Sequence, residues 1–334
     1  MLKTTEISGF LNELKLKTLQ KINELTYFNN SIVKRINDYI NYEGKMIRSS
    51  FFYIFFFSVF GRYKDESEVD LEELSKLGAI FELAHSATLV HDDILDSAKK
   101  RRGKDAVHIK FGIDGALIFG DILIISTLNK TYDINPFYSK ILMKALENMC
   151  FGEVLQYQNK FNVNLSLQDY FEIIKLKTGV LFGAISQIAY HYALSLLDKN
   201  IDNIVFQKLY EIFTDYGIAF QIVDDILDYT KDIKILKKDS NIDIITGRAT
   251  YPLILFLQSK INKEYYKKIW LKNPTYLANL VTKELKNNKD IINTAFTKAK
   301  DIINKYNLSE IIEFNQNWYR LLNNVIESFV FREF

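Results

Sequence analysis

Residues that interrupt helices are scarce in this chain of 334 residues. It contains 13 glycines and three prolines, and no proline falls between Pro136 and Pro252. Proline breaks helix interiors, and folds made of many short strands depend on glycine and proline for their turns. The shortage argues against a strand-rich fold, and we predict an all-α protein with long helices and few turns.

Cysteine, net charge and long apolar runs are scarce as well. Cys150 is the only cysteine, which excludes an internal disulfide framework, and a net charge of +2 with scattered basic residues gives no sign of a nucleic-acid partner. The most apolar run, FFYIFFFSVF at 51–60, has ten residues, against the roughly 20 that a membrane-spanning helix needs. We interpret this run as a buried core helix and expect no transmembrane segment.

Nothing in the sequence divides the chain. It has no linker, low-complexity tract or internal repeat, and 48% of its residues are hydrophobic, which is enough for a large core. We therefore expect a single helical domain over residues 1–334. The N-terminus carries Glu6 and Glu13 and lacks the apolar core of a signal peptide, so we expect a cytoplasmic location, with an organelle left open.

One acidic motif occurs twice, as HDDILD starting at His91 and as VDDILD starting at Val223. Each copy ends a stretch in which apolar residues recur at helical spacing, 72–95 for the first and 204–229 for the second. Charged residues follow both stretches. The spacing predicts two long, largely buried helices with an acidic motif at the C-terminal end of each.

The spacing of the acids within each motif suggests a metal site. Residues i and i+4 of a helix lie one above the other, so Asp92 projects together with Asp96, and Asp224 with Asp228. Each close pair carries a repulsion of about 4 kcal/mol unless a cation offsets it. Hard carboxylate ligands favour Mg²⁺ that keeps several waters and bridges a phosphorylated ligand. One such motif is as often a solvated helix end, but two copies after apolar sequence favour the metal. Zinc is disfavoured, because the lone cysteine and the four histidines show no ligand spacing.

Basic residues lie where a phosphate ligand could use them. Each is a weak signal alone and is more often a solvated side chain, but together they suit more than one polyphosphate. They are Lys45 and Arg48 in GKMIR, Arg101 and Arg102 after the first motif, Lys177 in KTG, and Lys238 and Arg248 after the second motif.

The motifs together resemble the trans-isoprenyl diphosphate synthase family. FELAHSATLVHDDILDSAKKRRG, GALIFGDILI and AFQIVDDILDY carry the resemblance, which runs from GKMIR at 44–48 to TGRATYPL at 246–253, with five motifs in the family's order. The C-terminal third matches only in being helical. The resemblance implies an isoprenoid-synthase type of all-α fold with a central cavity lined by long helices, and a homodimer.

The resemblance also implies a reaction and the residues that perform it. Isopentenyl diphosphate condenses with an allylic diphosphate, whose C–O bond ionises to an allylic cation, and about three Mg²⁺ ions per active site assist. The implied metal ligands are Asp92, Asp96, Asp224 and, through water, Asp228, while Asp93 and Asp225 are secondary. The implied catalytic residues are Lys177, Thr178, Gln221 and Arg101. Lys177, Arg101 and Lys238 neutralise the allylic diphosphate, Thr178 and Gln221 face the cation, and Lys45, Arg48, His85 and Arg102 form the isopentenyl diphosphate pocket.

Some positions depart from the family's pattern or have an ordinary structural explanation. Met46 and Ser49-Ser50 stand in place of the family's usual basic residue and proline, and Arg248 stands where lysine is common. His85 lies on the face expected to be buried, where a lone histidine is usually a core residue. None of these departures removes a metal ligand.

Two residues before the first motif bear on product length. Ala87 and Thr88 precede Asp92 by five and four positions, which puts Ala87 roughly 7–8 Å up the helix axis from that aspartate. Short-chain members of the family place aromatic residues there, and this chain has small ones. We therefore expect a long-chain product, of the kind used as a quinone side chain, although Phe81 or a residue at 141–151 could stop the chain earlier.

Several alternative functions are open at this point. A farnesyl or geranylgeranyl diphosphate synthase differs only in product length. A terpene cyclase or a head-to-head synthase has no need of the GKMIR and RRG groups for a second diphosphate. A non-catalytic subunit of a heteromeric prenyl synthase typically loses acids, and all six are present here. A calcium-buffering protein lacks its binding loop here.

Overall fold

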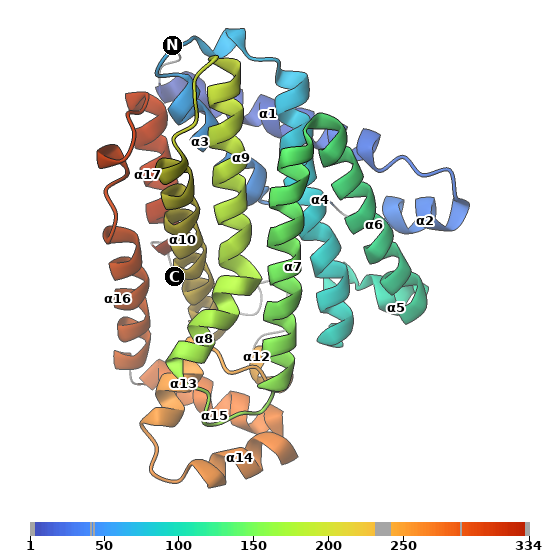
Figure 1. Ribbon diagram of the computed structural model, residues 1–334. Coiled ribbons are helices and arrows are strands. Elements are labelled where there is room, and N and C mark those ends of the chain that lie inside the picture. The colour runs from blue at the N-terminus through green and yellow to red at the C-terminus, as the bar shows by residue number, and fades with distance from the viewer. Residues whose placement is uncertain (1–3, 41, 43, 231–241, 288, 331–334) are drawn as a thin grey trace. The chain divides into compact units, whose positions relative to one another are not determined.

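The computed structural model describes residues 4–40, 42, 44–230, 242–287 and 289–330, and most of them are helical (Figure 1). The predicted all-α class is confirmed. One small departure was not foreseen, a two-stranded antiparallel hairpin in which Arg101 pairs with Lys104. None of the helices in the described part of the chain combines the length and hydropathy that a bilayer crossing requires.

The chain divides into two compact units. The first consists of Met1–Lys144, Ala184–Leu209 and Leu308–Val325, and the second of Ala145–Gly183, Tyr210–Asn307 and Ile326–Phe334. The expectation of a single domain stays a prediction.

The N-terminal elements all belong to the first unit. They are α1 (Thr4–Leu25), α2 (Ser31–Tyr39), α3 (Ile47–Phe60), the 3₁₀ turn η1 (Glu66–Glu68), α4 (Leu71–Leu95), β1 (Lys100–Arg101), β2 (Lys104–Asp105), α5 (Val107–Phe111) and α6 (Ile113–Ile134).

The later elements follow in chain order. They are α7 (Pro136–Gln158), α8 (Leu167–Ile174), the π-helical turn η2 (Lys175–Gly179), α9 (Val180–Leu196), α10 (Asn203–Thr230), α12 (Ile242–Ile245), α13 (Tyr251–Gln258), α14 (Lys263–Lys272), α15 (Pro274–Asn287), α16 (Asp290–Asn304), the 3₁₀ turn η3 (Leu308–Glu310) and α17 (Gln316–Val330).

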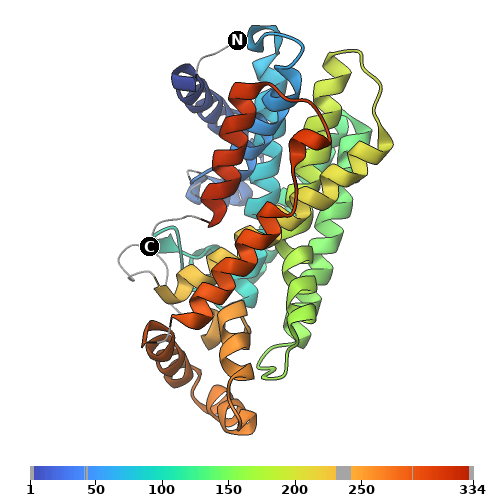
Figure 2. The same ribbon diagram turned by 90° about the vertical axis from the view of Figure 1, so that its left-hand side faces the viewer.

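Helix α3 is part of the first unit's core. Every residue from 51 to 60 is buried, which confirms that the aromatic run is a core helix. Trp318 stacks on Phe57 with ring centroids 4.8 Å apart, so a segment near the C-terminus lies beside α3 (Figure 2). Aromatic side chains bury large areas, so this packing contributes heavily to the unit's stability.

Helix α4 carries the first acidic motif and packs on α6. The Asp70 side chain caps its N-terminus by accepting a hydrogen bond from the Glu72 amide, and the helix ends beside Asp96 as the periodicity predicted. His91 lies against Gly120 of α6: a Cβ at Gly120 would stand 2.2 Å from its Nε2 atom. A side chain at position 120 would therefore have to displace the imidazole, which lies between the last turns of α4 and α6.

Helix α10 carries the second acidic motif and belongs to the second unit from Tyr210 onward. It spans Asn203–Thr230, close to the predicted 204–229. A Cβ at Gly217 would stand 2.7 Å from the Gly179 Cα atom, so the backbones of α10 and η2 nearly touch. Only glycine allows such a crossing, which sets the spacing between the two segments.

Candidate functional site

Asp92 and Asp96 stand one helical turn apart at the end of α4. The Asp96 amide donates to the Asp92 carbonyl at 2.9 Å, which is the geometry that places both side chains on one face. Asp92 is half-buried and Asp96 is buried. The first unit therefore presents a carboxylate pair of the predicted spacing.

Asp93 points away from this pair and binds Arg101. Its carboxylate is almost fully buried and accepts from the Arg101 Nε atom at 2.9 and 3.2 Å and from a second guanidinium nitrogen. A bidentate pair of this kind holds both partners in a fixed orientation. Asp93 thus ties the β1–β2 hairpin, with both of its arginines, to the end of α4.

Arg102 is positioned by its own backbone and by Gly44. It adopts a left-handed φ of 50°, and a Cβ at Gly44 would stand 3.0 Å from its terminal nitrogen. Burial lowers the pKa of the Arg102 guanidinium below its usual value, although the Glu82 carboxylate acts in the opposite direction. Glu82 also accepts from the Ser49 amide at 2.9 Å and from its hydroxyl at 3.0 Å.

These contacts bring together the segments that carry the predicted isopentenyl diphosphate residues. Lys45 follows Gly44 and Arg48 precedes Ser49, while His85 lies one turn after Glu82 on α4. Lys45 is exposed and both Arg48 and His85 are half-buried. Residues far apart in the sequence thus share one region of the first unit.

A cleft in the first unit lies beside this region. Asp93, Arg101 and Arg102 line it together with Ser86 of α4. The end of α2 and the hairpin form another wall, where the Tyr39 hydroxyl donates to the Asp105 carbonyl at 2.9 Å and Lys104 donates to the Tyr39 carbonyl at 3.2 Å, and both Tyr39 and Lys104 line the cleft. Three cationic side chains, Arg101, Arg102 and Lys104, line the cleft against two carboxylates, Asp93 and Asp105, and Asp93 is paired with Arg101. The remaining excess of positive charge is compatible with an anionic ligand.

The second acidic motif has one buried acid, against two in the first. Asp224 is exposed and Asp228 half-buried, whereas Asp225 is 5% exposed. Asp225 accepts from the Tyr170 hydroxyl at 2.7 Å, the Gln221 Nε2 atom at 2.9 Å and the Tyr251 amide at 3.3 Å. Burial and then the charge of Asp243 raise the pKa of Asp225 to about 7, while the three donors act in the opposite direction.

The predicted catalytic residues Thr178 and Gln221 are linked to this acid by hydrogen bonds within the second unit, and Lys177 is the neighbour of Thr178 in the sequence. The Thr178 hydroxyl donates to the Gln221 Oε1 atom at 2.8 Å, and Lys177, the neighbouring residue of the π turn, pairs with Glu153 and Gln156 of α7. A π turn inside a helix frequently marks a functional site.

The sequence reasoning missed several residues of these two regions. Glu153, Gln156 and Tyr170 were not predicted, because each acts on a partner far away in the sequence. The i, i+3 spacing of Glu153 and Gln156 on one helix face is the signal that could have drawn attention to the first two.

Four further predicted residues are Lys238, Arg248, Ala87 and Thr88. Lys238 lies outside the described residues. Arg248 lies 3.5 Å from the Asp243 carboxylate. Ala87 is fully buried among core residues of the first unit, while Thr88 is half-buried and donates to the His85 carbonyl at 2.9 Å. The chain-length role of these two residues stays a prediction.

The donor chemistry of the acid pairs fits a hard divalent cation. Within the described part of the chain no three His, Cys, Asp or Glu side chains come together as a complete metal site. Each pair offers carboxylate oxygens with no thiolate among them, which suits Mg²⁺ better than a soft metal.

The different environments of Asp92 and Asp93 lead to a stability prediction. Asp93→Ala should lower the free energy of unfolding by about 2–4 kcal/mol, because it leaves the half-buried Arg101 without its carboxylate. Asp92→Ala should cost distinctly less, because its side chain is partly exposed. Urea unfolding of the two variants checks this, and equal losses would contradict the different roles given to these neighbours.

Comparisons with known proteins agree with the motifs. The family model described as polyprenyl synthetase matches residues 30–287. Heptaprenyl diphosphate synthase component 2 of Bacillus subtilis (strain 168) is 31% identical over 227 residues, which cover 68% of this chain and 61% of that protein. Geranylgeranyl diphosphate synthase of Sulfolobus acidocaldarius is 32% identical over 259 residues, or 75% of this chain and 72% of that protein.

A solved structure shows the same fold. The polyprenyl synthase from Caulobacter crescentus CB15, complexed with calcium and isoprenyl diphosphate, matches with a TM-score of 0.84 over 98% of this chain and 97% of that one. At 24% identity this likeness establishes the fold alone. With the family model and the Sulfolobus relative, the resemblance seen in the motifs is confirmed, and the chain belongs to the polyprenyl synthetase family.

Proposed function

We propose that this protein is a Mg²⁺-dependent prenyltransferase that condenses isopentenyl diphosphate with an allylic diphosphate to give an all-trans polyprenyl diphosphate. The observation that supports this most directly is the complete set of acids. Both motifs keep all three aspartates, and in each the second aspartate is buried and held by hydrogen bonds, while the first and third are the proposed metal ligands.

Two groups of residues are proposed to bind the two diphosphates. Arg102, Lys45, Arg48 and His85 bind isopentenyl diphosphate, and their segments meet in the first unit. Lys177, Arg101 and Lys238 neutralise the allylic diphosphate. Thr178 and Gln221 present oxygen atoms to the allylic cation, a role that suits their hydrogen-bonded pair.

The proposed reaction needs no separate general base. The allylic C–O bond breaks, the double bond of isopentenyl diphosphate attacks the cation, and the released diphosphate takes the proton that is then lost. Asp92, Asp96, Asp224 and Asp228 are the proposed ligands of Mg²⁺, which when bound offsets the negative charge that develops on the leaving group.

We further propose a long-chain product, because small residues precede the first motif. Thr88 lies one helical turn before Asp92 and is partly exposed, so it is the residue that we propose to face a growing chain that starts at that aspartate. Ala87 is packed in the core. Its small side chain lets the neighbouring core residues pack close to α4, and we propose that it acts on product length only in this indirect way.

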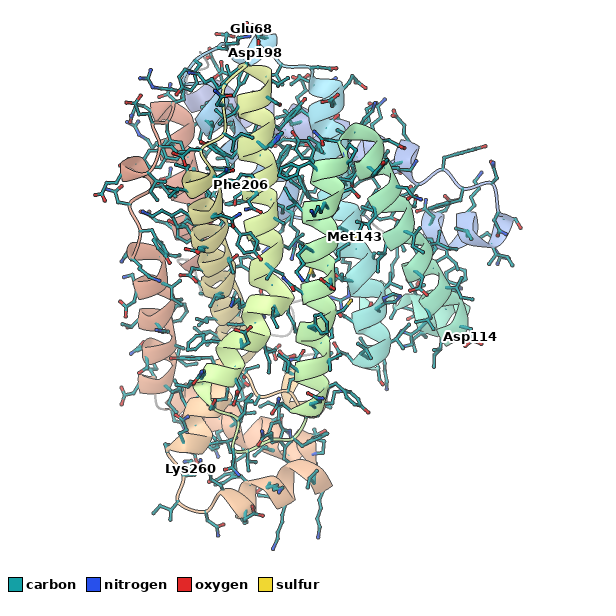
Figure 3. All side chains as sticks on the ribbon, viewed as in Figure 1. Glu68, Asp114, Met143, Asp198, Phe206 and Lys260 are labelled. Carbon is teal, nitrogen blue, oxygen red and sulfur yellow. The ribbon has the colours of Figure 1, made fainter. Side chains whose placement is uncertain are left out.

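A homodimer is the proposed assembly. In the first unit, α6 leaves Ile118, Ile125 and Tyr132 exposed at seven-residue spacing, and Met143 of α7 is 52% exposed (Figure 3). Apolar side chains spaced in this way form a stripe along one face of a helix, which favours a protein interface. The Bacillus relative is named a component of its synthase, so an assembly with a different partner chain is the alternative.

An assay of the purified chain tests the proposed activity. Wild-type protein with isopentenyl diphosphate, a short allylic primer and Mg²⁺ should release diphosphate and form prenyl products. Asp92→Ala and Asp224→Ala should each cut turnover by roughly two or more orders of magnitude, because each removes a proposed metal ligand. Helix content by circular dichroism is the control, and wild-type turnover in either variant would sink the assignment of the metal ligands.

Product length can be tested at two adjacent positions. Thr88→Phe should shift the products to about two to four isoprene units, because a ring in a packed channel cannot be bypassed. Ala87→Phe should instead lower the melting temperature, since it adds volume to a filled core. Chromatography of the products gives the lengths. Short products from the wild-type protein, or unchanged lengths in Thr88→Phe, would contradict the proposal.

Light scattering tests the proposed assembly. The wild-type protein at micromolar concentration should have twice the monomer mass of 39.1 kDa. Ile125→Glu should shift the mass towards the monomer, because it puts a charge in the apolar stripe. A monomeric wild-type protein would refute the homodimer, and if that protein is also inactive, the alternative with a partner component is favoured.

A further inference from the structure

The buried acid of the second motif belongs to an ordered hydrogen-bond chain. Within the second unit the chain runs from the Thr178 hydroxyl to the Gln221 carbonyl oxygen, and from the Gln221 Nε2 atom to the Asp225 Oδ1 atom. The other carboxylate oxygen, Oδ2, accepts from both Tyr170 and the Tyr251 amide. The two oxygens of Asp225 thus have separate sets of donors.

The backbone holds the members of this chain at a fixed spacing. Gly217, Gln221 and Asp225 follow one another at four-residue intervals, so they lie along one face of α10. Gly179, next to Thr178, touches the backbone at Gly217. The contact between the two glycines therefore sets the distance across which Thr178 meets Gln221.

The donors that meet Asp225 determine which atom donates in each following hydrogen bond. The Tyr251 amide is a backbone N–H at the start of α13, so it can only donate, and it fixes Oδ2 as an acceptor. In the ionised carboxylate the Oδ1 atom is an acceptor as well, and it accepts a hydrogen bond from the Gln221 amide nitrogen. Because a glutamine side chain has one oxygen and one nitrogen, this forces the Gln221 oxygen towards Thr178.

We infer that Asp225 and Tyr170 are positioning residues that orient the Gln221 amide, so that oxygen atoms of Gln221 and Thr178 and no N–H group face the allylic cation. This inference rests on the proposed function for the identity of the cation. The hydrogen bonds that link Thr178, Gln221, Asp225 and Tyr170 are observed whatever the function is. A reversed amide would direct two N–H groups towards Thr178, and partial positive charge there would oppose the developing cation.

The arrangement allows a reciprocal exchange of two side chains. In Asp225→Asn, the asparagine oxygen can keep Tyr170 and Tyr251 as donors, which turns its amide nitrogen towards Gln221 and forces the glutamine amide to reverse. In the double variant Gln221→Glu/Asp225→Asn, the introduced asparagine donates to one oxygen of the introduced glutamate, and the other oxygen of that glutamate again faces Thr178. Every hydrogen bond is then present, and one has changed direction.

Kinetics and thermal unfolding of both single variants and the double variant test the inference. Asp225→Asn should lower kcat by about tenfold or more, while the KM values for both substrates stay within about threefold, because ground-state binding does not use the amide. The double variant should regain at least about fivefold in kcat over Asp225→Asn. Gln221→Glu alone should lower the melting temperature, because it sets two carboxylates side by side, and adding Asp225→Asn should restore it.

Two results would overturn the inference. One is wild-type kcat in Asp225→Asn, and the other is a double variant no faster than Asp225→Asn and no more stable than Gln221→Glu. If the wild-type protein shows no turnover, the proposed function fails and the thermal data alone decide whether Asp225 orients Gln221.

Discussion

A carboxylate can be buried only where donors meet its oxygens, and both acidic motifs depend on this constraint. The second aspartate of each motif is swung about 100° from the first, towards the interior. Arg101 satisfies Asp93, and Gln221, Tyr170 and Tyr251 satisfy Asp225. Each motif therefore has one acid that anchors the helix end, and the other two are the proposed metal ligands.

The buried acids Asp93 and Asp225 have different kinds of partner, and they therefore position different groups. Asp93 uses a charged partner and holds a hairpin, so its effect reaches Arg102 through the adjacent backbone. Asp225 uses neutral donors and holds a single amide, so its effect reaches Thr178 through directed hydrogen bonds. Asp93 determines where the positive charge of the two arginines lies, and Asp225 determines which atoms of the Gln221 amide face Thr178.

The sequence predicted the positions of the helices well, but it did not predict the hydrogen-bond and ion-pair partners of buried side chains. Periodicity located both long helices to within a residue at each end, and the run at 51–60 was recognised as core because its length is too short for a membrane. The anchoring roles of Asp93 and Asp225 were missed, because a burial pattern does not show which distant donor meets a buried acid. The partners of Lys177 on α7 were missed for the same reason.

The contact of His91 with Gly120 links two positions on different helices. The imidazole fills the space that a side chain at 120 would occupy, so neither position can change freely while the other stays. A smaller residue at 91 leaves a gap that alanine at 120 can fill, whereas either substitution alone leaves a void or a collision. Over evolutionary time these two positions should therefore vary as a pair.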